Sequence, residues 1–486
     1  MFYSLILLLA FLVVMVSVGV WGMRKTATLN DFFLGGRTLG PWMSAFAYGT
    51  TYFSAVIFIG FAGSQGWNLG LNALWIGIGN ALLGAMLAWL VLGRRTRVMT
   101  QRLNVMTMPE FLEARYGSAH LKMISAVLMF VFLVPYSASV FKGLGHLFES
   151  TFGISYDFAL IVLVGITGIY LVLGGYFAVT LTDFIQGFIM LAGAVAMLVV
   201  LMAKAGGPAA AIAAAGSGYA AAAQGKSPSW LSVGSLIFMT SFGTWGLPQM
   251  VQKFYAIKDE RVIKKAAVIT AVFALVIGVT AYTTGAMSHV FFTPESVPRL
   301  ASGGVNYDLI IPTMLTQHLP EALLALVMLL VLSASMSTLA SLVLVSSSAV
   351  AIDLYKGYLH PDVDEKRSLV MMRVLSGVFV ISSYMISKMQ VGFIVTLMSL
   401  SWGVLSGAFM APYILGIFWK RVTKAGAYAG LFAGAGTAIV LFFVLGAARS
   451  PLASSIAMIV PFVVVPVVSL LTPKTDGETV RRAFGS

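Results

Sequence analysis

The chain has 486 residues, of which 59% are hydrophobic and only 10% charged, and its mean hydropathy is +0.94. Soluble globular proteins carry about 25% charged residues, so this composition excludes an ordinary soluble protein and indicates a polytopic membrane protein. Continuous rather than alternating hydrophobicity excludes a β-barrel, and the absence of cysteine excludes disulfides and thiolate metal sites.

Apolar runs of about 18 to 25 residues recur from end to end, and each is long enough to cross a bilayer as a helix. The first run has no basic region before it and no small-residue cleavage pattern after it, which predicts a retained helix rather than a secretory signal. We expect about 13 spans, at residues 3–22, 42–63, 71–92, 121–148, 156–176, 180–203, 230–252, 266–289, 320–352, 368–387, 391–417, 425–447 and 451–471.

The net charge of +13 resides in short loops, so it carries topology information rather than indicating nucleic-acid binding. With an odd number of spans, most loop cations share one side: Arg24, Lys25, Arg37, Arg94, Arg95, Arg97, Arg102, Arg115, Lys122, Lys253, Lys258, Arg261, Lys264, Lys265, Lys356, Lys366, Arg367, Lys420, Arg421, Lys424, Lys474, Arg481 and Arg482. The other side holds Lys204, Lys226, Arg299, Lys388 and Arg449. This bias predicts an outside N-terminus and a cytoplasmic C-terminus. The Ala/Gly-rich connection 205–229 is expected to be a partly helical or flexible linker.

Two spans contain polar or helix-breaking residues in their middle. Residues 44–55 of the second span read Ser-Ala-Phe-Ala-Tyr-Gly-Thr-Thr-Tyr-Phe-Ser-Ala, and residues 242–249 of the seventh contain two glycines and Pro248. Irregular backbone at membrane depth persists only where protein or water surrounds it. Each break could be a packing kink, but paired breaks in corresponding places of two five-span units indicate a transport site near the midplane.

The ninth span carries a row of small hydroxyl residues. Ala334, Ser337, Thr338 and Ser341 follow three- and four-residue steps, so they share one helix face. Neutral hydroxyl and carbonyl oxygens suit a weakly held hard cation such as Na⁺. Close helix packing in a membrane uses the same residue types, so both interpretations stand at this point.

Two charged residues fall inside spans. Asp183, near the start of span six, indicates cation or proton binding, or else favourable capping of a helix start. Lys142, in span four, predicts a contact with an anionic solute or a carboxylate, or snorkelling to the outer interface. Neither an HExxH nor a GxSxG pattern occurs in an apolar span, so we expect no catalytic residues and no enzyme.

With these residues in view, the chain resembles the sodium:solute symporter family over nearly its whole length. The similarity includes the motifs Asp31-Phe-Phe-Leu-Gly-Gly-Arg37, Met108-Pro-Glu-Phe-Leu, Leu147-Phe-Glu-Ser-Thr-Phe-Gly153, Gly174-Gly-Tyr-Phe-Ala-Val-Thr-Leu-Thr-Asp183, and Ser346-Ser-Ser through Asp353-Leu-Tyr-Lys356. The resemblance implies an all-α, leucine-transporter-type core. In that core, spans 2–6 and 7–11 form a five-plus-five inverted repeat with extra terminal helices. The implied division is a first helix and loop at 1–41, repeats at 42–203 and 230–417, an outer linker at 204–229, and terminal helices with a tail at 418–486.

The resemblance also implies ion sites. The family's conserved sodium site matches backbone positions Thr50 and Phe53 and the span-nine positions Ala334, Ser337 and Thr338. A second cation site of some members matches Asp183 and Ser341, although Ala340 stands where a serine would help.

For the solute, the resemblance implies a pocket formed by Tyr52, Ser54, Tyr136, Thr240, Thr244 and Trp245, with Lys142 as an anion contact. Tyr136 matches a tyrosine of the proline carrier. Tyr52 stands where that carrier has an aspartate, and Thr240 and Thr244 stand where it has aromatic residues. The span-seven pattern is closer to pantothenate-type members.

These observations predict a Na⁺-coupled symporter that takes up a small polar or anionic solute by alternating access. That solute could be an amino acid such as proline, a carboxylate or a pantothenate-like compound. The alternatives are a proton-coupled or uncoupled carrier of the same fold, and a membrane sensor that binds solute. We expect Na⁺ as the coupling ion, and a monomer in a bacterial-type inner (plasma) membrane with no nucleic-acid partner.

Overall fold

The computed structural model describes residues 2–23, 34–173, 176–224, 228–360, 362 and 364–485. Within these ranges the protein is helical and contains no β-structure beyond isolated bridges, which confirms the all-α prediction. Parts of two family motifs, at residues 31–33 and 174–175, lie outside the described residues, as do Arg24, Lys25 and Lys226.

The first half of the chain begins with α1 (Phe2–Met23) and a broken span made of α3 (Pro41–Tyr52), the π-helical turn η2 (Val56–Phe61) and α4 (Ala62–Leu69). The third span combines α5 (Leu74–Gly79), the π-helical η4 (Asn80–Leu87) and α6 (Ala88–Arg102). There follow α7 (Met108–Tyr116), α8 (Ala119–Phe152), α9 (Tyr156–Leu173), α10 (Tyr176–Lys204) and α11 (Pro208–Ala222).

The second half opens with another broken span, made of α12 (Trp230–Phe242), the short 3₁₀ turn η5 (Gly243–Trp245) and α13 (Pro248–Tyr255). It continues with α14 (Arg261–Ala286), α15 (Ser288–Phe291), α16 (Tyr307–His318), α17 (Glu321–Ser348) with its π-helical extension η6 (Ala349–Leu359), and α18 (Glu365–Lys388). The chain then forms α19 (Ile394–Phe418), α20 (Lys424–Leu445), α21 (Ser450–Leu471) and α22 (Gly477–Phe484).

In the described part of the chain, nine helical stretches are long and apolar enough to cross a membrane without interruption, and shorter apolar helices lie at Leu5–Val18 and Tyr156–Gly168. This number is below 13 because the first and fifth expected spans appear only as these shorter helices, the seventh span is divided, and Val56–Arg102 joins the second part of span two to span three. Every expected span nevertheless corresponds to a helix or to a divided pair of helices.

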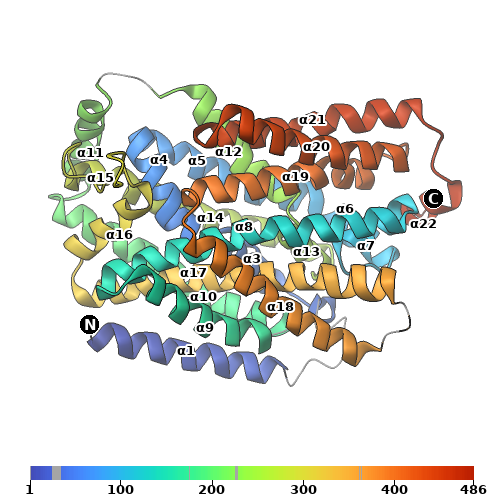
Figure 1. Ribbon diagram of the computed structural model, residues 1–486, viewed down its shortest axis with the longest axis horizontal. Coiled ribbons are helices and arrows are strands. Elements are labelled where there is room, and N and C mark those ends of the chain that lie inside the picture. Colours follow the sequence, from blue (N-terminus) through green and yellow to red (C-terminus); the bar gives the residue numbers. More distant parts are fainter. Residues whose placement is uncertain are drawn as a thin grey trace.

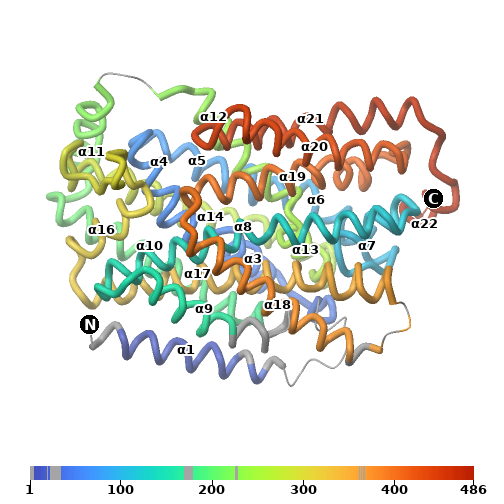
Figure 2. The backbone as a smooth tube through the Cα atoms, viewed as in Figure 1, coloured from blue at the N-terminus to red at the C-terminus, as the bar shows by residue number. Residues whose placement is uncertain are grey.

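The long helices run roughly along one direction (Figure 1), and the backbone trace shows the same bundle (Figure 2). The short helices α11, α15 and α16 lie at the end of the bundle where α1 begins, whereas α7 and α22 lie at the opposite end with the C-terminus (Figure 1). Sequence patterns had indicated none of α7, α15, α16 and α22 as helices, because each is short and lies in a loop or tail. The helix α17 is buried along nearly all of its length, and it contacts α3 and α13, one segment from each broken span.

Local sequence explains where several helices start and end. Thr107 and Glu110 form a reciprocal capping box at the start of α7. Ser118 caps α8, and Gly153 ends it in the left-handed conformation that glycine adopts without strain. Proline at the first position of α3 and of α13 fits a helix start, because that residue needs no backbone donor.

Candidate functional site

The break in the second span lies between Tyr52, where α3 ends, and Val56, where η2 begins. Phe53 has an extended backbone (φ −112°, ψ 127°), so the helical hydrogen bonds end at its N–H, which donates to the Gly49 carbonyl, and the following carbonyls lack partners within the helix. Gly49 permits this turn to approach α14, because a Cβ atom there would lie 2.6 Å from the Phe273 ring. The sequence-predicted irregular segment is therefore observed as a divided helix.

Hydroxyl groups of α17 donate hydrogen bonds to the backbone carbonyls of the break. Ser337 Oγ donates to the Thr50 carbonyl (2.9 Å) and the Ala334 carbonyl (2.9 Å). Thr338 Oγ1 lies 3.0 Å from the Ala334 carbonyl and 3.5 Å from that of Phe53. All five positions of the expected sodium site are thus brought together, and all are buried.

Two further contacts attach the break to the same helix. The Ala55 N–H donates to Ser335 Oγ (3.1 Å), and the Thr51 carbonyl lies 3.2 Å from Thr338 Oγ1. Neither Ser335 nor the Thr51 carbonyl was among the expected site residues. The signal for Ser335 was its place in the serine-rich run, whereas nothing in the sequence distinguishes the Thr51 carbonyl from its neighbours.

This cluster can hold a hard monovalent cation. It offers carbonyl and hydroxyl oxygens without formal charge, in a region that excludes solvent. In the structure the two hydroxyls donate protons to the carbonyls, and a cation at the centre would instead attract the lone pairs of both kinds of oxygen. The same hydroxyls therefore stabilise the break and offer ligands for Na⁺, so the packing and ion-binding interpretations are compatible.

A small pocket lies beside the break, between the two halves of the molecule. Its described lining residues are Tyr52, Phe53, Ser54, Val56, Ile57, Phe61, Asn80, Tyr136, Thr240, Tyr282, Met398 and Trp402, none of which is charged. The interior volume open to a water molecule is about 20 Å³, room for about one water. In this conformation the pocket is closed by its own side chains.

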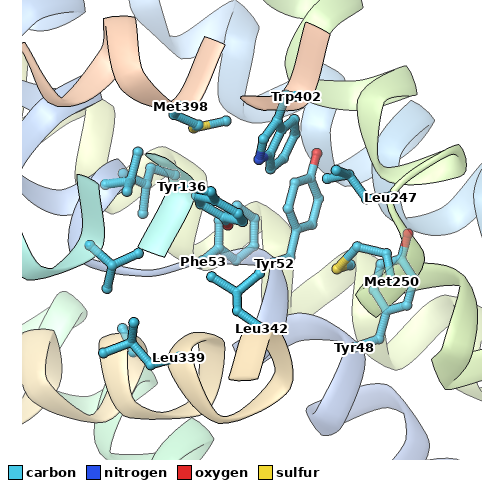
Figure 3. Close-up of a cluster of buried hydrophobic side chains, with 14 of the residues drawn as sticks. Tyr48, Tyr52, Phe53, Tyr136, Leu247, Met250, Leu339, Leu342, Met398 and Trp402 are labelled. Atoms are coloured by element: carbon cyan, nitrogen blue, oxygen red, sulfur yellow. The ribbon is translucent and has the colours of Figure 1, made fainter. Parts of the chain in front are cut away.

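Aromatic rings provide that closure. Tyr52 stacks on Phe53 with 4.4 Å between ring centroids, and Trp402 stands edge-on to Tyr136 at 5.7 Å. Figure 3 shows Tyr52, Tyr136, Met398 and Trp402 gathered between α3, α8 and α19. The hydroxyl of Tyr52 reaches across the pocket and donates to the Thr240 carbonyl (2.7 Å), near the end of α12.

The expected solute residues divide into two groups. Tyr52, Ser54, Tyr136 and Thr240 line the pocket, whereas Thr244 and Trp245 do not. Instead, Thr244 Oγ1 donates to the Gly84 carbonyl (3.1 Å) and Trp245 Nε1 to the Leu83 carbonyl (3.1 Å), so both attach the seventh-span break to η4.

Sequence reasoning missed most of the remaining lining residues. Asn80 begins η4, and its Oδ1 accepts the Thr240 hydroxyl (2.7 Å). The Trp402 indole Nε1 is buried and has no hydrogen-bond partner among the described residues. Aromatic residues within apolar spans normally form core, so nothing in the sequence indicated that Tyr282 and Trp402 border a pocket.

Lys142 and Asp308 form a buried ion pair that we call the outer pair, since it lies near α16. Lys142 Nζ is 2.9 Å from Asp308 Oδ2 and also donates to the Gly392 carbonyl. The Asp308 carboxylate accepts the Ile394 N–H at the start of α19 (3.3 Å). The protein's own carboxylate thus neutralises the ammonium that was expected to meet an anionic solute, so we do not carry Lys142 into the solute site.

Asp183 and Lys253 form a second buried ion pair, which we call the inner pair. Lys253 Nζ lies 3.6 Å from Asp183 Oδ2 and 3.0 Å from Ser341 Oγ. Asp183 is fully buried, and only 2% of Lys253 is exposed. The sequence had placed Lys253 in a cytoplasmic loop because it follows the end of an apolar run. The structure corrects this, since α13 extends to Tyr255 inside the bundle.

Comparison with known proteins gives the same picture. Residues 32–434 match the family model described as "Sodium:solute symporter family". The chain is 29% identical to the osmoregulated proline transporter OpuE of Bacillus subtilis, covering 98% of this chain and 96% of that one. It is 31% identical to the high-affinity proline transporter PutP of Bacillus subtilis (88% and 89% covered), and 30% identical to the sodium/proline symporter of Staphylococcus aureus (90% and 85%).

Solved structures share the fold. A Na⁺-coupled sialic acid symporter in a substrate-bound, outward-open state superposes with a TM-score of 0.80 at 18% identity, covering 98% of this chain and 99% of that one. The nucleobase-cation-symport-1 transporter Mhp1 superposes with a TM-score of 0.56 at 15% identity, covering 94% and 99%. These likenesses confirm the leucine-transporter-type fold.

Proposed function

The chain belongs to the sodium:solute symporter family, and from that premise we propose that it couples inward movement of Na⁺ to uptake of a small zwitterionic amino acid, with proline as the first candidate. Its relatives are named transporters, so the protein is a Na⁺-coupled multi-pass membrane transporter rather than an enzyme. The finer elements of the proposal are the solute, the residues that hold it, and the sodium ligands.

One observation carries the proposal: the hydroxyls of Ser337 and Thr338 lie against the Thr50 and Phe53 carbonyls of the break, next to a pocket lined by Tyr52 and Ser54. The backbone carbonyls of Thr50 and Phe53 face the proposed Na⁺. The side chains of Tyr52 and Ser54, on either side of Phe53 in the chain, face the proposed solute. A bound Na⁺ would fix the break against α17 and so favour the conformation in which Tyr52 and Ser54 are positioned for the solute.

The pocket suits a small zwitterion better than a large anion. The N-terminal end of η2 presents the positive end of a helix dipole, and Trp402 Nε1 is a buried donor without a described partner, so both favour a carboxylate. The carbonyl end of α12 favours an ammonium group, and the aromatic walls favour an apolar ring or chain. No lysine or arginine is among the described residues that line the pocket, so nothing there balances a pure anion.

The relatives named as proline transporters support the same solute. The family resemblance implies that the proline carrier has other residues at the positions of Tyr52, Thr240 and Thr244. These differences do not weaken the zwitterion argument, since Thr244 does not line the pocket and Tyr52 and Thr240 are joined to each other. They indicate that this protein and the proline carrier fill the space beside the break with different side chains.

We also propose the orientation and organisation expected from the sequence. Arg102 and Arg115 lie at the end of the bundle that holds α7 and α22, in accord with a cytoplasmic face there and an outside N-terminus. The repeats at 42–203 and 230–417 each begin with a broken span, as inverted repeats of this fold do. We propose a monomer in the plasma membrane.

The test is uptake of radiolabelled proline into proteoliposomes that contain the purified protein. An inward Na⁺ gradient should drive accumulation, and an inside-negative potential of 100 mV should add about 2.3 kcal/mol for each net charge moved. Replacement of Na⁺ by choline should abolish accumulation. Undiminished uptake driven by a pH gradient without Na⁺ would contradict sodium coupling and favour the proton-coupled alternative.

The solute is tested separately by thermal stabilisation of the detergent-solubilised protein. Proline should raise the melting temperature when Na⁺ is present, and carboxylates, pantothenate and sugars should not. Stabilisation by another solute class, with none by proline, would overturn the choice of solute and leave sodium coupling standing.

A further inference from the structure

We propose that the Lys253 ammonium is a built-in cation that occupies the position beside Asp183 and Ser341, where the family resemblance implies a second cation site, so that the protein binds and moves a single Na⁺ with each solute. The inference rests on the proposed function, because it concerns the number of ions that use the proposed sodium pathway. It assigns to Lys253 a role that its place in the sequence did not indicate.

The ammonium stands between the two residues that the sequence had marked for a second cation. Its Nζ atom is 3.0 Å from Ser341 Oγ, a hydrogen-bond distance, and 3.6 Å from Asp183 Oδ2, an ion-pair distance. Ser341 Oγ is in turn 3.0 Å from Thr51 Oγ1 on the broken helix. Hydroxyl oxygens and a carboxylate thus surround a positive charge that the chain itself supplies.

This position lies one helix turn along α17 from the proposed sodium site. Ser341 follows Thr338 by three residues and Ser337 by four, so it is on the same face of α17 about one turn, or about 5.4 Å, further along. Thr51 likewise directly follows Thr50, whose carbonyl contacts Ser337. One face of α17 therefore contacts two cationic positions one turn apart, the proposed Na⁺ and the Lys253 ammonium.

Charge balance argues against a second Na⁺ in addition to Lys253. Asp183 and Lys253 are both buried and together carry no net charge. A further Na⁺ among them would leave an uncompensated positive charge in a region closed to water, which is strongly unfavourable. Ala340 supplies no oxygen that would compensate, and Asp183 is the carboxylate to which Lys253 is already paired.

The pairing also explains how a carboxylate is stable in the buried interior of the bundle. Neither oxygen of Asp183 has a hydrogen-bond partner within the described part of the chain, so the ammonium charge is what stabilises it there. Removal of the ammonium would leave a buried, unpaired carboxylate beside Ser341 and Thr51, which is the donor set of a cation site.

The experiment counts Na⁺ bound to the purified full-length protein with radioactive ²²Na⁺, at pH 8.5 so that carboxylates remain ionised. Wild type should bind one Na⁺ at saturation. Lys253→Met should bind two, because the carboxylate and hydroxyls are released for an ion. The double variant Asp183→Asn/Lys253→Met should return to one, and Lys142→Met, which removes the ammonium of the outer pair, should remain at one.

The outcomes are distinct. Two Na⁺ bound to wild type, or one Na⁺ bound to a folded Lys253→Met protein, would overturn the inference. If Lys253→Met does not fold, the smaller Lys253→Ala variant is counted in its place with the same expectation of two Na⁺, and a single Na⁺ bound to folded Lys253→Ala would overturn the inference. A wild type that binds no Na⁺ would instead contradict the proposed function itself.

A second readout is the ratio of charge to solute in proteoliposomes, measured from the membrane potential at which net flux reverses. With a zwitterionic solute, one net charge per solute is expected for wild type. A ratio of two would contradict the inference while it upheld Na⁺-coupled transport.

Discussion

The two buried ion pairs use the same chemical groups, yet their surroundings differ. The outer pair is close, at 2.9 Å, and backbone groups at the start of α19 complete the hydrogen bonds of both partners. The inner pair is looser, at 3.6 Å, and its ammonium bonds to a side-chain hydroxyl that leads to the broken helix.

The groups that each pair contacts distinguish a structural ion pair from a functional one. The outer pair joins α8 to α16 and bonds to the backbone at the start of α19, so we interpret it as a structural link between these helices. The inner pair bonds to Ser341, which lies one helix turn from the proposed sodium ligands and is hydrogen-bonded to Thr51 of α3. Its carboxylate retains acceptor capacity that a cation could use.

The largest expected effect comes from breaking either pair by removing one charge. Asp183→Asn and Asp308→Asn should each destabilise the protein by about 3–5 kcal/mol, because each leaves a buried ammonium unpaired. Thermal unfolding in detergent measures the loss. Neutralising the second partner as well, with Lys253→Met or Lys142→Met, should recover most of it. No recovery in the double variants would contradict the pairing.

The next effect concerns the proposed sodium ligands above the inner pair. Ser337→Ala removes a hydroxyl that would contact the ion, and hydrogen bonds to charged groups contribute about 1.5–3 kcal/mol. We therefore expect the Na⁺ concentration for half-maximal uptake to rise about 10- to 150-fold. Ser347→Ala is a matched control on the same helix, because Ser347 Oγ bonds the Val343 carbonyl of its own helix. Equal Na⁺ dependence of both variants would count against the site.

A smaller effect is expected at the pocket beside the break. Trp402→Phe keeps an aromatic wall but removes the buried donor, so the KM for the solute should rise about tenfold through loss of a charge-assisted hydrogen bond. Trp89→Phe is the control, since the Trp89 indole N–H is likewise buried without a partner among the described residues but lies outside the pocket. An unchanged KM for Trp402→Phe would remove Trp402 from the solute site.

The smallest effect should come from Tyr52→Phe. The change removes only the hydrogen bond to the Thr240 carbonyl, worth about 1 kcal/mol, so solute affinity should change about fivefold while the Na⁺ count stays at one. Solute titration by thermal shift in saturating Na⁺ measures the change. A loss of all solute binding would show that the hydroxyl contacts the solute directly.

Much of the fold and half of the site could be predicted from sequence, for a physical reason. Polar residues such as Thr50 and Ser337 stand out within apolar runs, because a membrane-spanning segment must satisfy every polar group it buries. The other residues of the site and of the ion pairs do not differ in this way from their sequence surroundings. Trp402 and Tyr282 look like ordinary core, Lys253 looks like a loop charge after an apolar run, and Asp308 looks like a residue of a solvated outer connection. Only the three-dimensional arrangement shows that these last two are buried.

The central claim is that one Na⁺, held between the break and α17, prepares the pocket for the solute. It is tested most directly by the binding of proline to the purified protein with and without Na⁺, measured by calorimetry. Because coupling of two binding sites is reciprocal, Na⁺ should raise proline affinity about 5- to 150-fold, and proline should raise Na⁺ affinity by the same factor. Equal proline affinity in Na⁺ and in choline would contradict the account.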